Sequence, residues 1–326
     1  MAEVVVTGAT GFTGSHLCRR LVRDGHSVAA LVRATSRTAG LEQLGVRCRV
    51  ADLGQPAGLR AAIDGASVVY HVAAAYRVEH ADRDEFRRVN VEATRNLLQA
   101  AAEQGVERFV HCSTVGVQGQ IDDPPANEEY RFQPGDHYQE SKLAGEKEAL
   151  LFAARGLPVS VVRPVGIYGP GDSRFLKLFR AIARGRFVMI GSGRTLYHMT
   201  YVEDLVRGIV LCGTSPAAPG QVFTIAGPEY TTLDELVGFV AAELGCRKPR
   251  MRVPLAPVLA AAAACEAVCR PLGINPPLYP RRVEFFAKDR AFDISKARRL
   301  LGYEPQVALR EGIARTARWY REQGWL

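Results

Sequence analysis

The chain has 326 residues, of which 47% are hydrophobic, and a formal net charge of +8. This length and content are enough for a large buried core, in one large domain or two lobes, and the lack of any apolar run of about 18 residues argues against a membrane-spanning helix. Seven scattered cysteines, an odd number, argue against a disulfide framework or a zinc site and favour a reducing, cytoplasmic setting.

The positive charge favours anionic ligands or a membrane surface, or it reflects a solvated basic face. Arginines dominate it, with clusters at residues 247–252 and 281–282. No recognisable nucleic-acid-binding module accompanies the charge, so we expect no nucleic-acid partner. The opening residues MAEVVVTG lack the basic segment and apolar core of a signal peptide, which also favours a cytoplasmic location.

The first structural signal is a strand, a glycine-rich turn and a helix in direct succession. Residues 3–7, EVVVT, predict a buried parallel strand that leads into Gly8, Gly11 and Gly14 and then a helix over residues 15–23. The first glycine allows a tight turn, the second lets backbone approach a pyrophosphate, and the third allows close helix–strand packing. The pattern predicts a phosphate site at a helix N-terminus; the alternative is a glycine-rich turn without a ligand.

Short apolar runs alternate with helical segments through the first half of the chain, which predicts a doubly wound parallel sheet with its ligand at the carboxyl ends of the strands. These runs are Val4–Val6, Val28–Val32, Val46–Val50, Val68–Val72, Phe109–His111 and Val159–Val162. After Gly166 the alternation stops, proline and glycine become dense, and the strand signals weaken.

A second chemical signal is YQESK, which places Tyr138 and Lys142 four residues apart on one helical face. A phenol with a pKa near 10 is a poor acid–base catalyst at neutral pH. The ammonium of Lys142 is expected to lower the pKa of Tyr138 toward the working range, and so is the positive ring of a nicotinamide dinucleotide if its pyrophosphate binds at the glycine turn. The alternative is an ordinary surface pair on an amphipathic helix.

The spacing TGxxGxxG with YxxxK downstream resembles the extended short-chain dehydrogenase/reductase superfamily, the NAD-dependent epimerase/dehydratase family, from Val4 to about Trp319. The segment RPVGIYGPGD looks more like its 3β-hydroxysteroid dehydrogenase and ketone-reductase branch. The resemblance implies an α/β, Rossmann-type domain over residues 1–165, rejoined by about 199–226. It also implies a smaller, interleaved C-terminal substrate lobe over residues 166–198 and 227–326.

By the same resemblance, Tyr138 exchanges the proton with the substrate, and Thr114 bonds the reacting oxygen. Lys142 lowers the pKa of Tyr138 and bonds the nicotinamide ribose, which positions the cofactor. Ser113 is the alternative hydroxyl, because one gap in the loop would exchange the two. Asn90 matches a helix residue that helps hold the active-site strand and its water.

The implied cofactor is a nicotinamide dinucleotide, and no metal is expected. Its glycine-turn and active-site contacts would be Gly8, Thr10, Gly11, Phe12, Thr13, Gly14, Ala73, Tyr138, Lys142, Pro164 and Val165. Asp52 and Leu53 match the adenine contact. Arg33 stands where NAD-preferring relatives carry an acidic residue, and with Ser36 or Arg37 it can pair with a 2′-phosphate. We therefore favour NADP(H) over NAD(H).

Two departures from the nucleotide-sugar pattern bear on the substrate. Tyr197 and Gly166 stand where those relatives carry an Arg and an Asn that bind the diphosphate, although Arg194 is close enough in sequence to compensate. The apolar helix at about residues 255–268 lines a lipid-like pocket, touches a membrane surface or packs in the small lobe; it is too short to span a bilayer.

These observations lead to three functional hypotheses. The first is an NAD(P)-dependent oxidoreductase that interconverts a secondary alcohol and a ketone on a mostly apolar, steroid- or lipid-like small molecule. The second is a nucleotide-sugar 4-epimerase or dehydratase with retained NAD, and the third is a non-catalytic dinucleotide-binding regulator. We expect a homodimer. The sequence also allows peripheral contact with a membrane surface.

Overall fold

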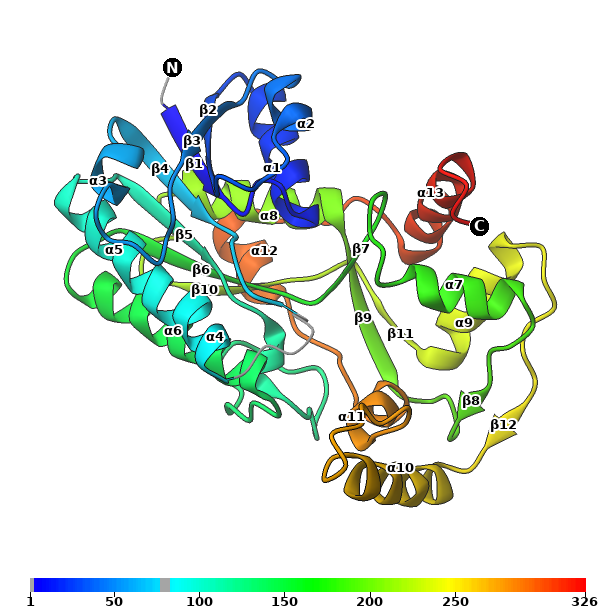
Figure 1. Ribbon diagram of the computed structural model, residues 1–326. Coiled ribbons are helices and arrows are strands. Elements are labelled where there is room, and N and C mark those ends of the chain that lie inside the picture. The colour runs from blue at the N-terminus through cyan, green and yellow to red at the C-terminus, as the bar shows by residue number, and fades with distance from the viewer. Residues whose placement is uncertain (1–2, 77–82) are drawn as a thin grey trace.

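The computed structural model describes residues 3–76 and 83–326. Its main feature is a seven-stranded, fully parallel sheet in the order β10-β6-β5-β4-β1-β2-β3 (Figure 1). The strands are β1 (Glu3–Thr7), β2 (Ser27–Val32), β3 (Arg47–Val50), β4 (Ala66–His71), β5 (Arg108–Cys112), β6 (Val159–Pro164) and β10 (Val222–Ile225). The strand order reverses between β1 and β4, so the predicted doubly wound α/β architecture is confirmed.

Both faces of the sheet are covered along its inner strands, which explains why those strands read as apolar runs without alternation. The edge strand β3 is an exception: its side chains are exposed or half-buried, so the buried strand expected over residues 46–50 is not seen. In β1, Val4 and Val6 pack into one buried cluster and Val5 into another, because successive side chains of a strand point to opposite faces. The helices α1 (Phe12–Arg23) and α8 (Val202–Thr214) cover the first face, and α5 (Ala93–Glu103) and α6 (His137–Ala154) cover the second (Figure 1). The short α2 (Ala39–Glu42) and α3 (Leu59–Ala62) lie near the β3 edge.

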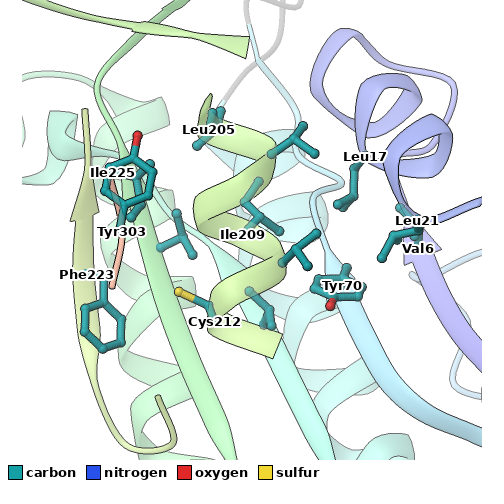
Figure 2. Close-up of a cluster of buried hydrophobic side chains, with 14 of the residues drawn as sticks. Val6, Leu17, Leu21, Tyr70, Leu205, Ile209, Cys212, Phe223, Ile225 and Tyr303 are labelled. Carbon is teal, nitrogen blue, oxygen red and sulfur yellow. The ribbon is translucent and has the colours of Figure 1, made fainter. Parts of the chain in front are cut away.

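Helix α8 is the centre of the first cluster (Figure 2). Its residues Leu205, Ile209 and Cys212 lie between the side chains of α1 and those of β10. Tyr303, which follows α12 (Ser295–Leu301), packs on the same cluster, and its hydroxyl donates to the Ala226 carbonyl at 2.8 Å. Segments far apart in sequence therefore complete the nucleotide-side core.

A third buried cluster is built by the later elements, which lie beyond the sheet (Figure 1). We refer to these elements as the small lobe; the exact domain boundaries stay a prediction. Its strands are β7 (Gly166–Tyr168), β8 (Met189–Ile190), β9 (Leu196–Tyr201), β11 (Tyr230–Thr232) and β12 (Arg252–Val253). Its helices are α7 (Leu176–Ala183), α9 (Leu233–Glu243), α10 (Leu255–Cys269), α11 (Pro280–Val283) and α13 (Leu309–Glu322).

Helix α10 is the apolar segment that the sequence singled out, and it lies at the outer end of the small lobe (Figure 1). Of its 15 residues only Ala262 is buried, so packing in the small lobe does not explain its composition. Among the described residues, no helix is both long and apolar enough to cross a bilayer. Contact with a membrane surface stays a prediction.

Two histidines are buried side by side in the middle of the sheet. His71 is bonded on both ring nitrogens, to Thr7 Oγ1 at 2.8 Å and to Thr94 Oγ1 at 2.9 Å. The His111 ring lies 5.5 Å away, and neither of its nitrogens has a hydrogen-bond partner. Burial lowers the pKa of His71 to about 3 and places the pKa of His111 well below its ordinary value.

We therefore expect the free energy of unfolding to decrease as the pH falls from about 6.5 toward 5. The unfolded chain binds protons in that range while both buried rings stay neutral, which costs up to about 1.4 kcal/mol per pH unit for each ring. Urea unfolding at several pH values measures this slope. His111→Leu should make it shallower without loss of stability at pH 7.5; an unchanged slope would contradict the assignment.

Candidate active site

The glycine turn after β1 is shaped by contacts between backbone atoms. A Cβ on Gly14 would lie 2.1 Å from the Gly8 carbonyl oxygen, and one on Gly8 would lie 2.7 Å from the Ala73 nitrogen. Gly8 also has a φ of +69°, where side chains are strained. Helix α1 then begins at Phe12, and its N-cap residue, Gly11, has no side chain to accept from the first N–H groups of the helix. Its first N–H groups are left for an anion, so this turn fits a dinucleotide pyrophosphate.

The residues proposed for the adenosine end follow β2 and β3. Arg33 is exposed directly after β2, and its N–H donates to Ser36 Oγ at 3.1 Å, which makes a tight turn. Arg37 is exposed one residue beyond that turn. After β3, the Asp52 carboxylate accepts from the Gly54 N–H at 2.9 Å and the Leu53 carbonyl accepts from Asn96 at 3.1 Å. Both groups lie at the carboxyl edge of the sheet, as predicted.

Helix α6 carries the phenol and the ammonium. It begins after Asp136, whose carboxylate accepts from the Gln139 N–H at 2.9 Å. Its buried face is polar in its first half, because Lys142 and Glu146 follow Tyr138 at intervals of four residues. Lys142 is 2% exposed, and its Nζ donates to the Cys112 carbonyl at 2.6 Å. This bond joins α6 to the end of β5.

The two candidate hydroxyls after β5 lie in different surroundings. Thr114 has extended backbone and caps the 3-10 turn η2 (Val115–Gln118), and its Oγ1 accepts from the Gly116 N–H at 3.1 Å. Ser113 is buried, and its hydroxyl donates to Glu146 Oε2 at 2.6 Å. Since the Ser113 hydroxyl is committed to that carboxylate, the structure disfavours it as the catalytic hydroxyl and leaves Thr114 as the candidate.

Asn90 lies in the π-helical segment η1 (Arg88–Glu92), between α4 (Arg83–Arg87) and α5. Its side chain bonds the N–H and the carbonyl of Ala75 at 2.8 and 3.1 Å and donates to Ser141 Oγ at 2.9 Å. A Cβ on Gly145 would lie 2.3 Å from the Asn90 carbonyl oxygen. Asn90 therefore fixes the segment after β4 against α6; the predicted hold on the active-site strand and its water stays a prediction.

The ionisation of the pair differs from the sequence expectation. Burial raises the pKa of Tyr138 above its ordinary value, and the charge that opposes this effect is Arg174 rather than Lys142. Burial also lowers the pKa of Lys142, against the opposing influence of Cys112 and Glu146. The expected lowering of the Tyr138 pKa by Lys142 is thus not seen, because desolvation dominates and the ammonium is bonded to the Cys112 carbonyl.

Tyr76 and Arg174, neither of which was among the predicted site residues, lie near Tyr138. The Tyr76 ring packs edge-on against the Tyr138 ring, with centroids 4.9 Å apart. The guanidinium of Arg174 lies 5.5 Å from the Phe12 ring and 5.9 Å from the Tyr76 ring, and its Nε donates to the buried Asp172 at 2.7 Å. No spacing in the sequence indicates this meeting, because Arg174 arrives from the small lobe.

Gly166 and Tyr197 stand where nucleotide-sugar relatives carry the two side chains that bind the diphosphate. A Cβ on Gly166 would lie 2.9 Å from Met199 Sδ, so a longer side chain requires rearrangement there. Tyr197 is 5% exposed, donates to the Phe285 carbonyl and accepts from Arg290 Nη1 at 2.9 Å. The backbone N–H of Arg194 donates to Ser192 Oγ at 3.2 Å, and its side chain is exposed. Within the described ranges, no group of three or more His, Cys, Asp or Glu could hold a metal ion.

Comparison with known proteins agrees with this geometry. Residues 4–226 match the model of the NAD dependent epimerase/dehydratase family. Sterol demethylase protein B of Methylococcus capsulatus is 31% identical, covering 99% of both chains. A 3β-hydroxysteroid dehydrogenase/Δ5→4-isomerase of Mycobacterium tuberculosis is also 31% identical, over 98% of this chain and 90% of its own.

Among solved structures, MoeE5 in complex with UDP-glucuronic acid and NAD superposes with a TM-score of 0.78 at 30% identity, covering 99% of this chain and 100% of its own. The relatives are enzymes, so the predicted enzyme class and the resemblance to the 3β-hydroxysteroid dehydrogenase branch are confirmed. The chain belongs to the NAD-dependent epimerase/dehydratase family.

Proposed function

We propose that this chain is an NAD(P)-dependent oxidoreductase that interconverts a secondary alcohol and a ketone on a mostly apolar, steroid- or lipid-like substrate. The observation that carries the proposal is the hydrogen bond from Lys142 Nζ to the Cys112 carbonyl. It brings the helix that carries Tyr138 to the strand end that carries Thr114. Tyr138, Lys142 and Thr114 are the three groups to which we assign the chemistry.

In this proposal Tyr138 delivers the proton to the ketone oxygen during reduction. The raised pKa of Tyr138 supports that direction, because the phenol keeps its proton at neutral pH until the carbonyl oxygen gains charge. Thr114 Oγ1 orients the oxygen, and Lys142 fixes the helix and supplies positive charge. Arg174, held by Asp172, adds a second positive charge that favours the phenolate formed when Tyr138 gives up its proton.

A bound nicotinamide dinucleotide supplies or accepts the hydride. The glycine turn, Ala73, Pro164 and Val165 would hold it, and Arg33 with Ser36 or Arg37 would meet a 2′-phosphate. The exposed Arg33 at the end of β2 supports NADP(H), while the NAD in the MoeE5 complex supports NAD(H). We favour NADP(H) on the strength of Arg33.

An apolar substrate is supported by Gly166 and Tyr197, neither of which offers a charge-assisted donor to a diphosphate. The steroid-acting relatives support the same class. The nucleotide-sugar 4-epimerase or dehydratase remains the second candidate, favoured by the UDP-glucuronic acid in MoeE5. The non-catalytic regulator is the third. The homodimer and the cytoplasmic location stay predictions.

Tyr138→Phe should lower kcat by about 100-fold or more, because the phenol donates the proton to a ketone and the phenolate accepts it from an alcohol, and leave dinucleotide affinity within a few-fold. The assay follows nicotinamide absorbance with dehydroepiandrosterone, a 3β-hydroxysteroid, and with UDP-glucuronic acid. A net change in nicotinamide absorbance identifies an oxidoreductase. Conversion of the sugar without a net change in nicotinamide absorbance identifies an epimerase. Tyr230→Phe, at an exposed ring, is the control. Full activity of Tyr138→Phe would remove the assigned donor.

Gly14→Ala should weaken NADPH binding by at least about 10-fold and destabilise the fold by about 1–3 kcal/mol, since the new methyl group overlaps the Gly8 carbonyl. Fluorescence titration and thermal unfolding measure the two effects. Gly40→Ala is the matched control, because a Cβ there meets nothing within 4 Å. Equal binding by the two variants would rule out the turn as the pyrophosphate site.

Arg33→Asp should shift the ratio of NADPH to NADH affinity toward NADH by about 10-fold or more, because a carboxylate repels the 2′-phosphate. Arg310→Asp makes the same change in net charge at another exposed position and should leave the ratio unchanged. Dissociation constants for both cofactors measure the shift. The assignment of NADP(H) fails if Arg33→Asp leaves the ratio at its original value.

A further inference from the structure

Directly behind the candidate site, Glu146 and Arg163 form a buried ion pair. Arg163 Nη2 lies 2.5 Å from Glu146 Oε1 and its Nε lies 3.1 Å from Oε2, and the side chains are 2% and 0% exposed. Desolvation of two such charges consumes much or all of their mutual attraction. A buried pair is therefore weak evidence for stability, and what it holds in place becomes the question.

On one side the pair holds the end of β5. Ser113 donates its hydroxyl proton to Glu146 Oε2 at 2.6 Å, and its N–H donates to the Val162 carbonyl at 2.7 Å. Ser113 stands between Cys112, whose carbonyl binds Lys142, and Thr114. In extended backbone successive side chains point to opposite sides. A fixed Ser113 side chain therefore also fixes the direction of the Thr114 hydroxyl.

On the other side the pair is anchored, through Glu128, to the edge strand β10 of the same sheet. Arg163 Nη1 donates to the Glu128 carbonyl at 2.9 Å. The Glu128 carboxylate accepts from the Thr224 N–H, in β10, at 2.7 Å. Arg163 itself lies in β6 directly before Pro164 and Val165. The carboxylate of Glu146 is thus held from two strands and from its own helix, and it has little freedom to move.

We infer that Glu146, held by Arg163, is a positioning residue that sets Thr114 and Lys142 through the hydroxyl of Ser113. The inference rests on the proposed function and extends it to groups that do not touch the substrate. Tyr138, Lys142 and Glu146 share one face of α6, so the helix bears the proton donor at one end of this face and the anchor of the opposing strand at the other.

A second consequence of the same placement is electrostatic. Burial lowers the pKa of Lys142, and the negative charge of Glu146 opposes that change. Glu146 therefore helps to keep Lys142 protonated in its dry site. Arg163 bonds both oxygens of the same carboxylate, so Glu146 has charge-assisted partners in its buried position.

The hydrogen-bonded connection from Ser113 through Glu146 to Arg163 is called the tether below. The test uses two variants that break this tether at different points and one matched control. Ser113→Ala removes the hydroxyl but leaves the ion pair intact, and Glu146→Gln removes the charge. The control is Glu148→Gln, on the same helix, where Glu148 forms a comparable pair with Arg95 at 2.5 Å on the protein surface. Because Ser113→Ala keeps the buried charges paired, it stays informative if Glu146→Gln folds poorly.

We expect kcat to fall about 10- to 100-fold in both tether variants through misplacement of the reacting groups. KM and the NADPH dissociation constant should change less than about threefold. The double variant should be no slower than Glu146→Gln, since both changes break one connection. Glu148→Gln should behave as the original protein. A folded Ser113→Ala protein with unchanged kcat would overturn the inference.

Hydrogen exchange of the protein without substrate or cofactor gives a readout that does not depend on turnover. In Ser113→Ala the amide of Gly116, which is bonded to Thr114 Oγ1, should exchange faster than in the original protein and in Glu148→Gln. Unchanged exchange also counts against the inference. Tyr138→Phe separates the two proposals: if it keeps full activity the proposed function fails, whereas if only Ser113→Ala keeps full activity the positioning role fails.

Discussion

The hydrogen bond between the Lys142 ammonium and the Cys112 carbonyl is the interaction on which the candidate site depends. It forms where Lys142 is 2% exposed, and because a buried ammonium is costly it requires compensation nearby. Glu146 supplies negative charge from one turn further along the same helix. The helix and the strand are thereby joined by charge as well as by packing.

The site exists because a parallel sheet brings the ends of distant strands to one edge. The register pairs Thr7 with His71, and His71 with His111. Immediately beyond these residues come the glycine turn, the segment held by Asn90, and the Thr114 turn. Each strand therefore ends in one component of the site. The two neutral histidines lie beneath that edge, and their burial links the stability of the sheet to pH.

The small lobe contributes positive charge to the candidate site. Arg174 follows β7, is held by Asp172, and reaches Phe12 and Tyr76 across the boundary between the two parts. Its positive charge opposes the rise in the pKa of Tyr138 that burial causes. In the same lobe, Gly166 lies close to Met199, and the Tyr197 hydroxyl is bonded to the Phe285 carbonyl and to Arg290.

The sequence alone determined the features that depend on local rules. Apolar runs specified the buried strands, glycine spacing specified the turn at Gly8 and Gly14, and a four-residue interval put Tyr138 and Lys142 on one helical face. Tertiary structure decided what depends on neighbours from elsewhere in the chain. Ser113 and Thr114 are adjacent hydroxyls in sequence, and only the buried carboxylate of Glu146 distinguishes them. The pKa of Tyr138 likewise follows from its burial and from Arg174, because desolvation is set by everything packed around a group and not by its own segment.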